Sequence, residues 1–407
     1  MRALLVAVGT RGDVQPVIAL ALELRKLGHA ARLCISPNFV AGAKALGLEA
    51  VPMGVEMRLP AQNSSALPAL TPEELRRLRE SLPDLITDQF ETVGAAVDGC
   101  DVIVGGNAHQ YAAPSIAERA GIGCVTAVYA PVALPSPELA PPPAPGRVAD
   151  LATGASIEDQ WRDTAKEWNA RALERINANR ARLGMAPIAD VLDYVLTDHT
   201  WLAADAALAP VPTTPGRAIF QTGTWVLPDR TPLPAELEAF LQGGTAPICI
   251  GFGSMPAAAD ASRQLIGAAR ALGRRLIVSK GWAGLDVIDA APDCIAVDEV
   301  SHDVLFPRVA PVVHHGGAGT TATAARAGVP QIITPMFSDQ FYWARRIVDL
   351  GLGATIAHAA LTEESLTAAL RQVCDPAVAL RARTFAAQVR WDGAEVAARR
   401  LAAEYGA

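Results

Sequence analysis

A glycine-rich turn in the second half of the chain carries the residue types best suited to bind an anion. The stretch APVVHHGGAGTTATAARAG starts at Ala310 and predicts a buried strand, a turn after the two histidines, and a helix from Gly319. Glycines let the backbone approach a ligand, and the unpaired N–H groups of Gly319, Thr320 and Thr321 attract negative charge. The His315 imidazole and the threonine hydroxyls can add donors. We therefore expect a metal-free diphosphate site at His315, Gly316, Gly317, Gly319 and Thr320.

Two further turns carry polar residues that the same ligand could reach. GFGS ends a strand and places Ser254 where open α/β sheets bind ligands, and MFSDQF places Asp339 and Gln340 at a helix start. A carboxylate and an amide together can bind vicinal sugar hydroxyls. The alternatives are plain: a tight turn with threonine caps and two core histidines, a glycine-rich turn at Ser254, and helix capping by Ser338 and Asp339.

The first turn of the chain could supply a carboxylate to the same ligand. VAVGTRGDVQP puts Thr10 and Asp13 directly after an apolar run, with a helix expected from Val14. Asp13 would then face a cleft between two domains of the chain, or it would serve only as the N-cap of that helix. The turn has neither the G-x-G-x-x-G pattern nor a P-loop, which argues against an NAD or ATP site.

Alternating apolar runs and helical patterns position these turns. Short Val-, Ile- and Leu-rich runs such as Ala3–Val8 and Asp101–Gly105 each precede a helical pattern, which predicts parallel sheets covered on both faces. The same alternation restarts at Pro247–Ser254. We therefore expect two Rossmann-like domains. The proline-rich segment Pro131–Pro145 is expected to form a loop, because its prolines fit neither a helix nor a central strand.

The segment LAPVPTTPGR, Leu208 to Arg217, has no periodicity and is expected to link the two domains. We expect a first domain over residues 1–210 and a second domain over residues 211–385. Helical patterns over Glu363–Val373 and Ala377–Ala403 leave residues 386–407 for a terminal helix.

Composition and charge exclude several classes of protein. A chain of 407 residues with 51% hydrophobic residues has enough apolar surface for two cores, and its net charge of −7 argues against binding nucleic acid. No apolar run approaches the roughly 20 residues that span a bilayer, and no signal peptide is expected. Six scattered cysteines without a Cys-x-x-Cys pair fit a reduced cytoplasmic interior. We expect a cytoplasmic monomer.

Seven motifs together resemble one enzyme family: GTRGDVQP, TDHTWLAAD, QTGTWVLPD, GFGS, SKGWAGL, VVHHGGAGTT and PMFSDQ. In this order they are similar to the glycosyltransferases of vancomycin-type glycopeptide antibiotics, through the whole chain. The resemblance is strongest after about Asp193 and weakest over about residues 54–81 and 132–155, which shape the acceptor pocket in that family.

The resemblance implies a GT-B fold, with two Rossmann-like domains facing each other across a cleft and a terminal helix crossing back to the first. It implies that residues 1–210 bind the acceptor and residues 211–385 bind the nucleotide-sugar. It implies inverting transfer, Asp13 as the general base, and Asp339 and Gln340 as the sugar contacts. Thr10 and Ser254 would join the diphosphate contacts, and Val300 and Trp282 would lie at the nucleotide base. The Asp13 position is often a histidine in the wider superfamily.

The donor expected from the resemblance is a dTDP- or UDP-sugar, with a preference for dTDP. Related plant enzymes hold the ribose with a glutamate eight residues after the phosphate histidine, where this chain has Thr323. No Asp-x-Asp occurs that could carry a bridging metal. The acceptor would be a small hydroxyl-bearing aglycone such as a glycopeptide, polyketide, lipid or sterol. A GT-B nucleotide-sugar epimerase and a non-catalytic GT-B binding protein are the alternatives.

Overall fold

The first domain is built on a seven-stranded parallel sheet. In a computed structural model that describes residues 1–56, 84–143, 154–255, 260–282 and 284–406, its strand order is β3-β2-β1-β4-β5-β6-β7. The strands are β1 (Arg2–Ala7), β2 (Ala30–Ile35), β3 (Glu49–Pro52), β4 (Val102–Gly106), β5 (Gly123–Val128), β6 (Thr200–Leu202) and β7 (Phe220–Gln221). The order reverses beside β1, so the carboxyl ends of β1 and β4 form the point where such sheets bind ligands.

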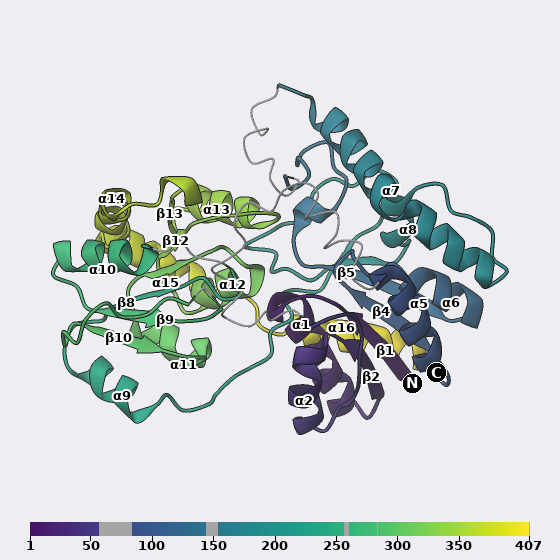
Figure 1. Ribbon diagram of the computed structural model, residues 1–407, viewed down its shortest axis with the longest axis horizontal. Helices are drawn as coiled ribbons and strands as arrows, with labels where there is room; N and C mark the ends of the chain where they lie inside the picture. The colour runs from purple at the N-terminus through teal and green to yellow at the C-terminus, as the bar shows by residue number, and fades with distance from the viewer. Residues whose placement is uncertain (57–83, 144–153, 256–259, 283, 407) are drawn as a thin grey trace.

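The helices of this domain lie on both faces of the sheet (Figure 1). They are α1 (Arg11–Lys26), α2 (Pro37–Ala45), α5 (Leu85–Ala96), α6 (Ala113–Ala120), α7 (Ile157–Arg182) and α8 (Val191–Val195), with a 3-10 turn at Pro131–Ala133. Beyond that turn, the proline-rich loop has no regular structure as far as residue 143, as expected. Of the weakly matching stretches 54–81 and 132–155, residues 57–81 and 144–153 lie outside the described residues.

The second domain repeats the same topology with six strands. Its sheet has the order β10-β9-β8-β11-β12-β13, again reversing beside the first strand of the domain. The strands are β8 (Ile248–Gly251), β9 (Leu276–Ser279), β10 (Cys294–Val297), β11 (Val312–His314), β12 (Gln331–Ile333) and β13 (Gly353–Thr355). The helices are α9 (Ala235–Gln242), α10 (Ala261–Ala271), α11 (His302–Leu305), α12 (Ala318–Arg326), α13 (Gln340–Asp349), α14 (Glu363–Val373) and α15 (Pro376–Ala386), with 3-10 turns at Phe306–Arg308 and His358–Ala360.

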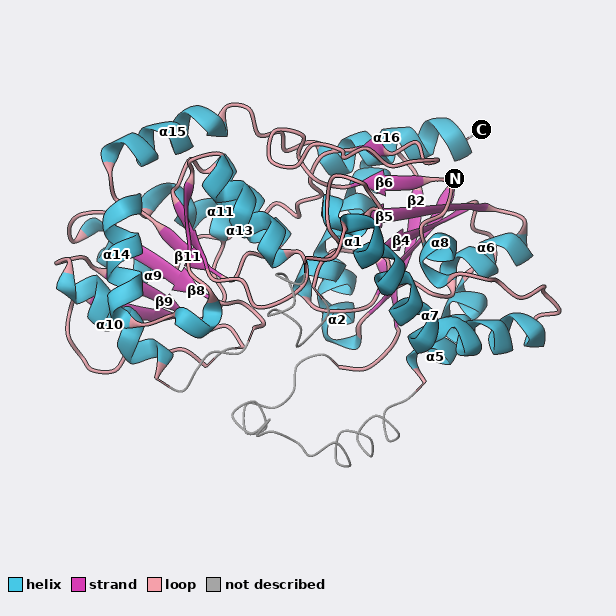
Figure 2. Ribbon diagram, turned by 90° about the horizontal axis from the view of Figure 1, so that it is seen from above, coloured by secondary structure: helices cyan, strands magenta, loops and turns pink. Residues whose placement is uncertain are grey.

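The last helix returns to the first domain. A terminal helix was expected over residues 386–407, and the structure has one, α16 (Gly393–Tyr405), which starts seven residues later and packs against α1. Figures 1 and 2 show α16 beside the first domain, with the two chain termini close together. Ala397, Ala398 and Leu401 are fully buried there in the core shared with the sheet.

The chain thus crosses between the domains twice, and the two crossings touch. β7 lies beyond the boundary expected at residue 210, so the first crossing leaves the sheet after Gln221. At the contact, a Cβ on Gly393 would lie 2.3 Å from the Gly223 carbonyl carbon. The Asp205 carboxylate accepts a hydrogen bond of 2.8 Å from the Arg390 N–H. In the described part of the chain, no helix is both long and apolar enough to cross a membrane.

Candidate functional site

The glycine-rich turn forms an anion cradle at the end of β11. Helix α12 begins at Ala318 with Gly317 as its N-cap, one residue earlier than expected. Thr321 therefore does not offer donors to a ligand: its N–H and its hydroxyl both donate to the Gly317 carbonyl, at 2.9 Å each, and its side chain is fully buried. The unpaired amides belong to the first three helical residues, Ala318, Gly319 and Thr320.

The two adjacent histidines have different roles. His314 is held in the core, since its Nε2 lies 2.9 Å from Gln331 Oε1 and its Nδ1 accepts the Gly316 N–H at 3.1 Å. Burial lowers the pKa of His314 to about 3, which keeps it neutral. Only one of the pair is therefore a core histidine.

His315 is the histidine that faces the cradle. Its Nδ1 is buried with no hydrogen-bond partner among the described residues. A Cβ on Gly317 would lie 2.7 Å from the His315 Nε2, and a Cβ on Gly253 would lie 3.3 Å from its Cε1. The ring thus lies between the turns that follow β8 and β11. Burial lowers the pKa of His315 to about 4, so the imidazole would donate to an anion as a neutral group.

The residues predicted to bind the base lie beside the Ser254 turn. The backbone N–H of Trp282 donates to the Gly253 carbonyl at 2.8 Å, and this bond joins the turn after β9 to the turn after β8. Val300 follows β10, the next strand in the sheet, and Ser254, Trp282 and Val300 are all partly exposed. Because neighbouring parallel strands end at one edge, these three residues and His315 share the same rim of the second domain.

Asp339 and Gln340 differ in what they can offer a ligand. Asp339 precedes α13 without capping it, and its Oδ2 accepts the Trp343 indole N–H at 2.9 Å. Burial raises the pKa of Asp339 to about 6, and the negative charge of Asp13 adds to that rise. Gln340 is buried, and its Oε1 accepts the N–H groups of Met336 and Phe337 at 2.8 and 3.3 Å. In this structure the Gln340 amide oxygen therefore holds the turn.

Asp13 lies at the matching rim of the first domain. Thr10 is the N-cap of α1, so Asp13 is the third helical residue rather than the N-cap considered above. Its Oδ2 accepts the Thr10 N–H at 2.8 Å, the reciprocal half of a capping box, and the Thr10 hydroxyl at 3.3 Å. Its Oδ1 accepts the Asn107 amide at 3.0 Å. In this structure, the Thr10 N–H and hydroxyl thus both donate to Asp13.

Sequence reasoning missed several residues that follow β4. Besides Asn107, the turn carries His109, whose ring stacks on Trp168 of α7 with centroids 5.0 Å apart and planes 11° apart. The His109 Nδ1 lies 3.2 Å from the Tyr111 hydroxyl. Part of His109 is open to solvent, yet desolvation by the surrounding protein lowers its pKa, while the charge of Asp13 acts to raise it. An aromatic wall of His109, Tyr111 and Trp168 therefore stands near Asp13.

An ion pair joins the two rims across the cleft. Arg11, at the start of α1, lies 2.5 Å from the carboxylate of Glu299, which precedes Val300. The pKa of His302 is lowered chiefly by burial and in addition by the positive charge of Arg11. Arg11 therefore lies near His302 of the second domain. The described residues contain no group of three or more His, Cys, Asp or Glu side chains placed to hold a metal ion.

Comparisons with known proteins show the family to which this chain belongs. Residues 3–135 match the glycosyltransferase family 28 N-terminal domain, and residues 263–400 match the erythromycin biosynthesis protein CIII-like C-terminal domain. The vancomycin aglycone glucosyltransferase of Amycolatopsis orientalis is 43% identical over 98% of this chain and 97% of its own length. The dTDP-epi-vancosaminyltransferase of the same organism is 39% identical over 94% of this chain and 92% of its own.

Solved structures show the same fold at lower identity. The kitacinnamycin glycosyltransferase superposes with a TM-score of 0.73 at 19% identity, covering 99% of both chains. The glycosyltransferase VinC in complex with dTDP superposes with a TM-score of 0.67 at 20% identity, covering 99% of this chain and 100% of its own. With full-length relatives at about 40% identity and two matched domains, the chain belongs to the vancomycin-type family of GT-B glycosyltransferases.

Proposed function

We propose that this glycosyltransferase moves a hexose or deoxyhexose from a dTDP-sugar, or less readily a UDP-sugar, to a hydroxyl of a natural-product aglycone. One observation carries the proposal: Asp13 and the His315 cradle lie at the switch points of two sheets, in two domains that the Arg11–Glu299 ion pair joins. The names of the vancomycin aglycone and dTDP-epi-vancosaminyl relatives support the donor and acceptor classes.

The second domain would hold the donor. The amides of Ala318, Gly319 and Thr320 and the neutral His315 imidazole donate to the diphosphate without a metal ion. Ser254 follows Gly253, which lies beside the ring of His315, and can add a hydroxyl donor. Trp282 and Val300 flank the nucleotide base. Asp339 has one oxygen, Oδ1, without a partner among the described residues, and that oxygen can accept a sugar hydroxyl.

The first domain would hold the acceptor and remove its proton. As the acceptor oxygen attacks the anomeric carbon, Asp13 takes the hydroxyl proton and the bond to the diphosphate oxygen breaks, leaving the nucleoside diphosphate with the electron pair. Attack from the face opposite the leaving group inverts the anomeric centre. The aromatic wall of His109, Tyr111 and Trp168 offers the acceptor an apolar surface near Asp13.

The test combines nucleotide titration with product analysis. Calorimetry with dTDP and UDP measures donor binding, and mass spectrometry of reactions with glycopeptide, macrolide, flavonoid and sterol aglycones detects a gain of one sugar. Asp13→Asn keeps an acceptor for the Thr10 N–H, so it should bind dTDP normally and lose about 10² to 10⁴ in kcat. His315→Ala should weaken dTDP binding by about 1.5–3 kcal/mol, the value of a hydrogen bond to a charged group.

His199→Ala is the matched control, because His199 is exposed at the opposite edge of the first sheet. It should leave both measurements unchanged. Near-normal turnover by a folded Asp13→Asn protein would remove Asp13 as the base. Release of free sugar without an acceptor would indicate an epimerase-type hydrolysis, and binding without any product would indicate a non-catalytic protein.

A further inference from the structure

The carboxylate of Asp13 is held by two turns that are neighbours only in the folded sheet. Thr10 follows β1 and Asn107 follows β4, and these strands pair directly at the switch point. The Asn107 Nδ2 donates to Asp13 Oδ1 at 3.0 Å, while the Asn107 backbone N–H donates to the Ala127 carbonyl on β5 at 2.7 Å. The asparagine is thus anchored to the sheet through its backbone and reaches Asp13 with its side chain.

The orientation of the Asn107 amide is determined by its two partners. Its Oδ1 accepts the Ala108 N–H at 2.9 Å, so the NH₂ group must face Asp13. The reversed amide would place an oxygen against the carboxylate and a donor against the Ala108 N–H. The backbone of Asn107 is left-handed, with φ of 67°, a conformation that asparagine tolerates better than most residues.

The two oxygens of Asp13 differ in their free lone pairs. Oδ2 accepts both the N–H and the hydroxyl of Thr10, whereas Oδ1 accepts only the Asn107 amide among the described residues. A carboxylate oxygen has two lone pairs, so Oδ1 keeps one for an incoming hydroxyl. We propose that Asn107 is a positioning residue that holds Asp13 Oδ1 as the basic oxygen, an inference that rests on the proposed role of Asp13.

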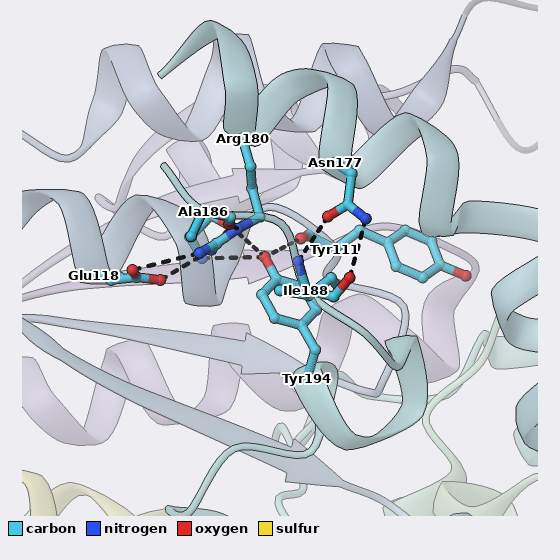
Figure 3. A network of polar contacts seen from close by, with 8 residues as sticks. Tyr111, Glu118, Asn177, Arg180, Ala186, Ile188 and Tyr194 are labelled. Atoms are coloured by element: carbon cyan, nitrogen blue, oxygen red, sulfur yellow. Dashed lines mark hydrogen bonds and ion pairs between the residues drawn. The ribbon is translucent and has the colours of Figure 1, made fainter. Parts of the chain in front are cut away.

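The far end of the turn is held by a buried polar network (Figure 3). The Tyr194 hydroxyl donates to the Tyr111 carbonyl at 2.9 Å and pairs with the Ser115 hydroxyl at 2.6 Å. Arg180, which is buried, donates to Ser115 Oγ at 2.8 Å and to Glu118 Oε2 at 2.9 Å. Helices α6, α7 and α8 are thereby tied behind the turn that carries Asn107. A turn with both ends held can keep its amide aimed at Asp13.

Asn107→Gly tests the inference because glycine keeps the left-handed backbone and removes the amide. We expect kcat to fall about tenfold to 100-fold, the range for losing a hydrogen bond to a charged group. The Kd for dTDP and the KM for the acceptor should change little. In the Asp13→Asn background the same substitution should cause no further loss, since Asn107 would act through Asp13.

The variant Asn107→Asp tests the inference through the pH profile of kcat/KM. A purely structural role of Asn107 would leave that profile unchanged. The aspartate keeps the acceptor for the Ala108 N–H but places a second carboxylate about 3.0 Å from Asp13. Two carboxylates at that distance share a proton, so the acid limb of the pH profile of kcat/KM should move to higher pH. Wild-type kcat in folded Asn107→Gly, or an unmoved acid limb in Asn107→Asp, would overturn the inference. The proposed function fails on different results, namely release of free sugar without an acceptor, or nucleotide binding with no product.

Discussion

At the residue scale, Asp339 combines a cost in stability with a proposed use in binding. Its pKa is raised to about 6 from the ordinary 3.8, chiefly by burial. The folded state therefore favours the protonated carboxyl, and ionisation of Asp339 makes folding less favourable as pH rises from about 3.8 through about 6. Below that window the folded and unfolded states are both protonated, and the penalty vanishes.

Asp339→Asn should therefore raise the free energy of unfolding at pH 8 and leave it nearly unchanged at pH 3.5. Asparagine removes the ionisation and keeps an oxygen that can accept the Trp343 N–H. Chemical denaturation at the two pH values measures the difference. The same variant should bind a dTDP-sugar more weakly than wild type while binding dTDP equally. A stability gain that is equal at both pH values would contradict the charged state assigned to Asp339.

Residue types alone located part of the site. The glycines, His315 and Asp339 could be found because each belongs to a compact motif next to an apolar run. Asn107 could not, since its partner Asp13 is 94 positions away and only the sheet order makes β1 and β4 adjacent. The one available signal was a strand followed by Asn107 at a predicted sheet edge. The roles of His315, Asp13 and Trp282 remain predictions.

At the element scale, α7 contributes an aromatic side chain to the wall near Asp13. Trp168→Ala should raise the KM for the acceptor severalfold or more and leave dTDP affinity unchanged, because it removes the ring that stacks on His109. Initial rates over a range of acceptor concentrations give the KM, and calorimetry gives the dTDP affinity. Trp168→Phe keeps an aromatic face and should restore much of the lost affinity. If Trp168→Ala changes only dTDP binding, the wall does not contact the acceptor.

Most elements were predictable because their signals are local. Alternating apolar runs and helical periodicity predicted two parallel sheets, though not the short strands β3, β6, β7 and β13. The helix α14 matches its expected bounds of Glu363–Val373. The break between α15 and α16 was predicted at residue 386 but its length was not, because alanine-rich sequence on both sides favours helix. That break is required by tertiary structure, since residues 387–392 carry the chain across to the first domain. The start of α1 at Arg11 depended on the capping contacts of Thr10.

At the scale of the whole molecule, the contact between the two crossings should limit how the domains move. Gly393→Ala would place a methyl group 2.3–2.5 Å from the backbone of Gly223 and Thr224, so one crossing must shift. We expect a loss of about 1–3 kcal/mol in stability, as in other overpacked sites. Thermal unfolding measures the loss. Gly42→Ala is the matched control, because Gly42 is helical with open space around it, and it should be neutral or stabilising.

The return of α16 makes the second domain an insertion within the first domain. The chain leaves the first domain after β7 and returns to it at α16, whose side chains are part of the first domain's core. The residues between these two points form the second domain. A chimera that exchanges the second domain between two relatives is therefore built by cutting the gene at two places and transplanting the segment between them. A single cut near the middle would give the recipient sheet a foreign α16 and leave the apolar face of α1 against a surface to which it is not fitted.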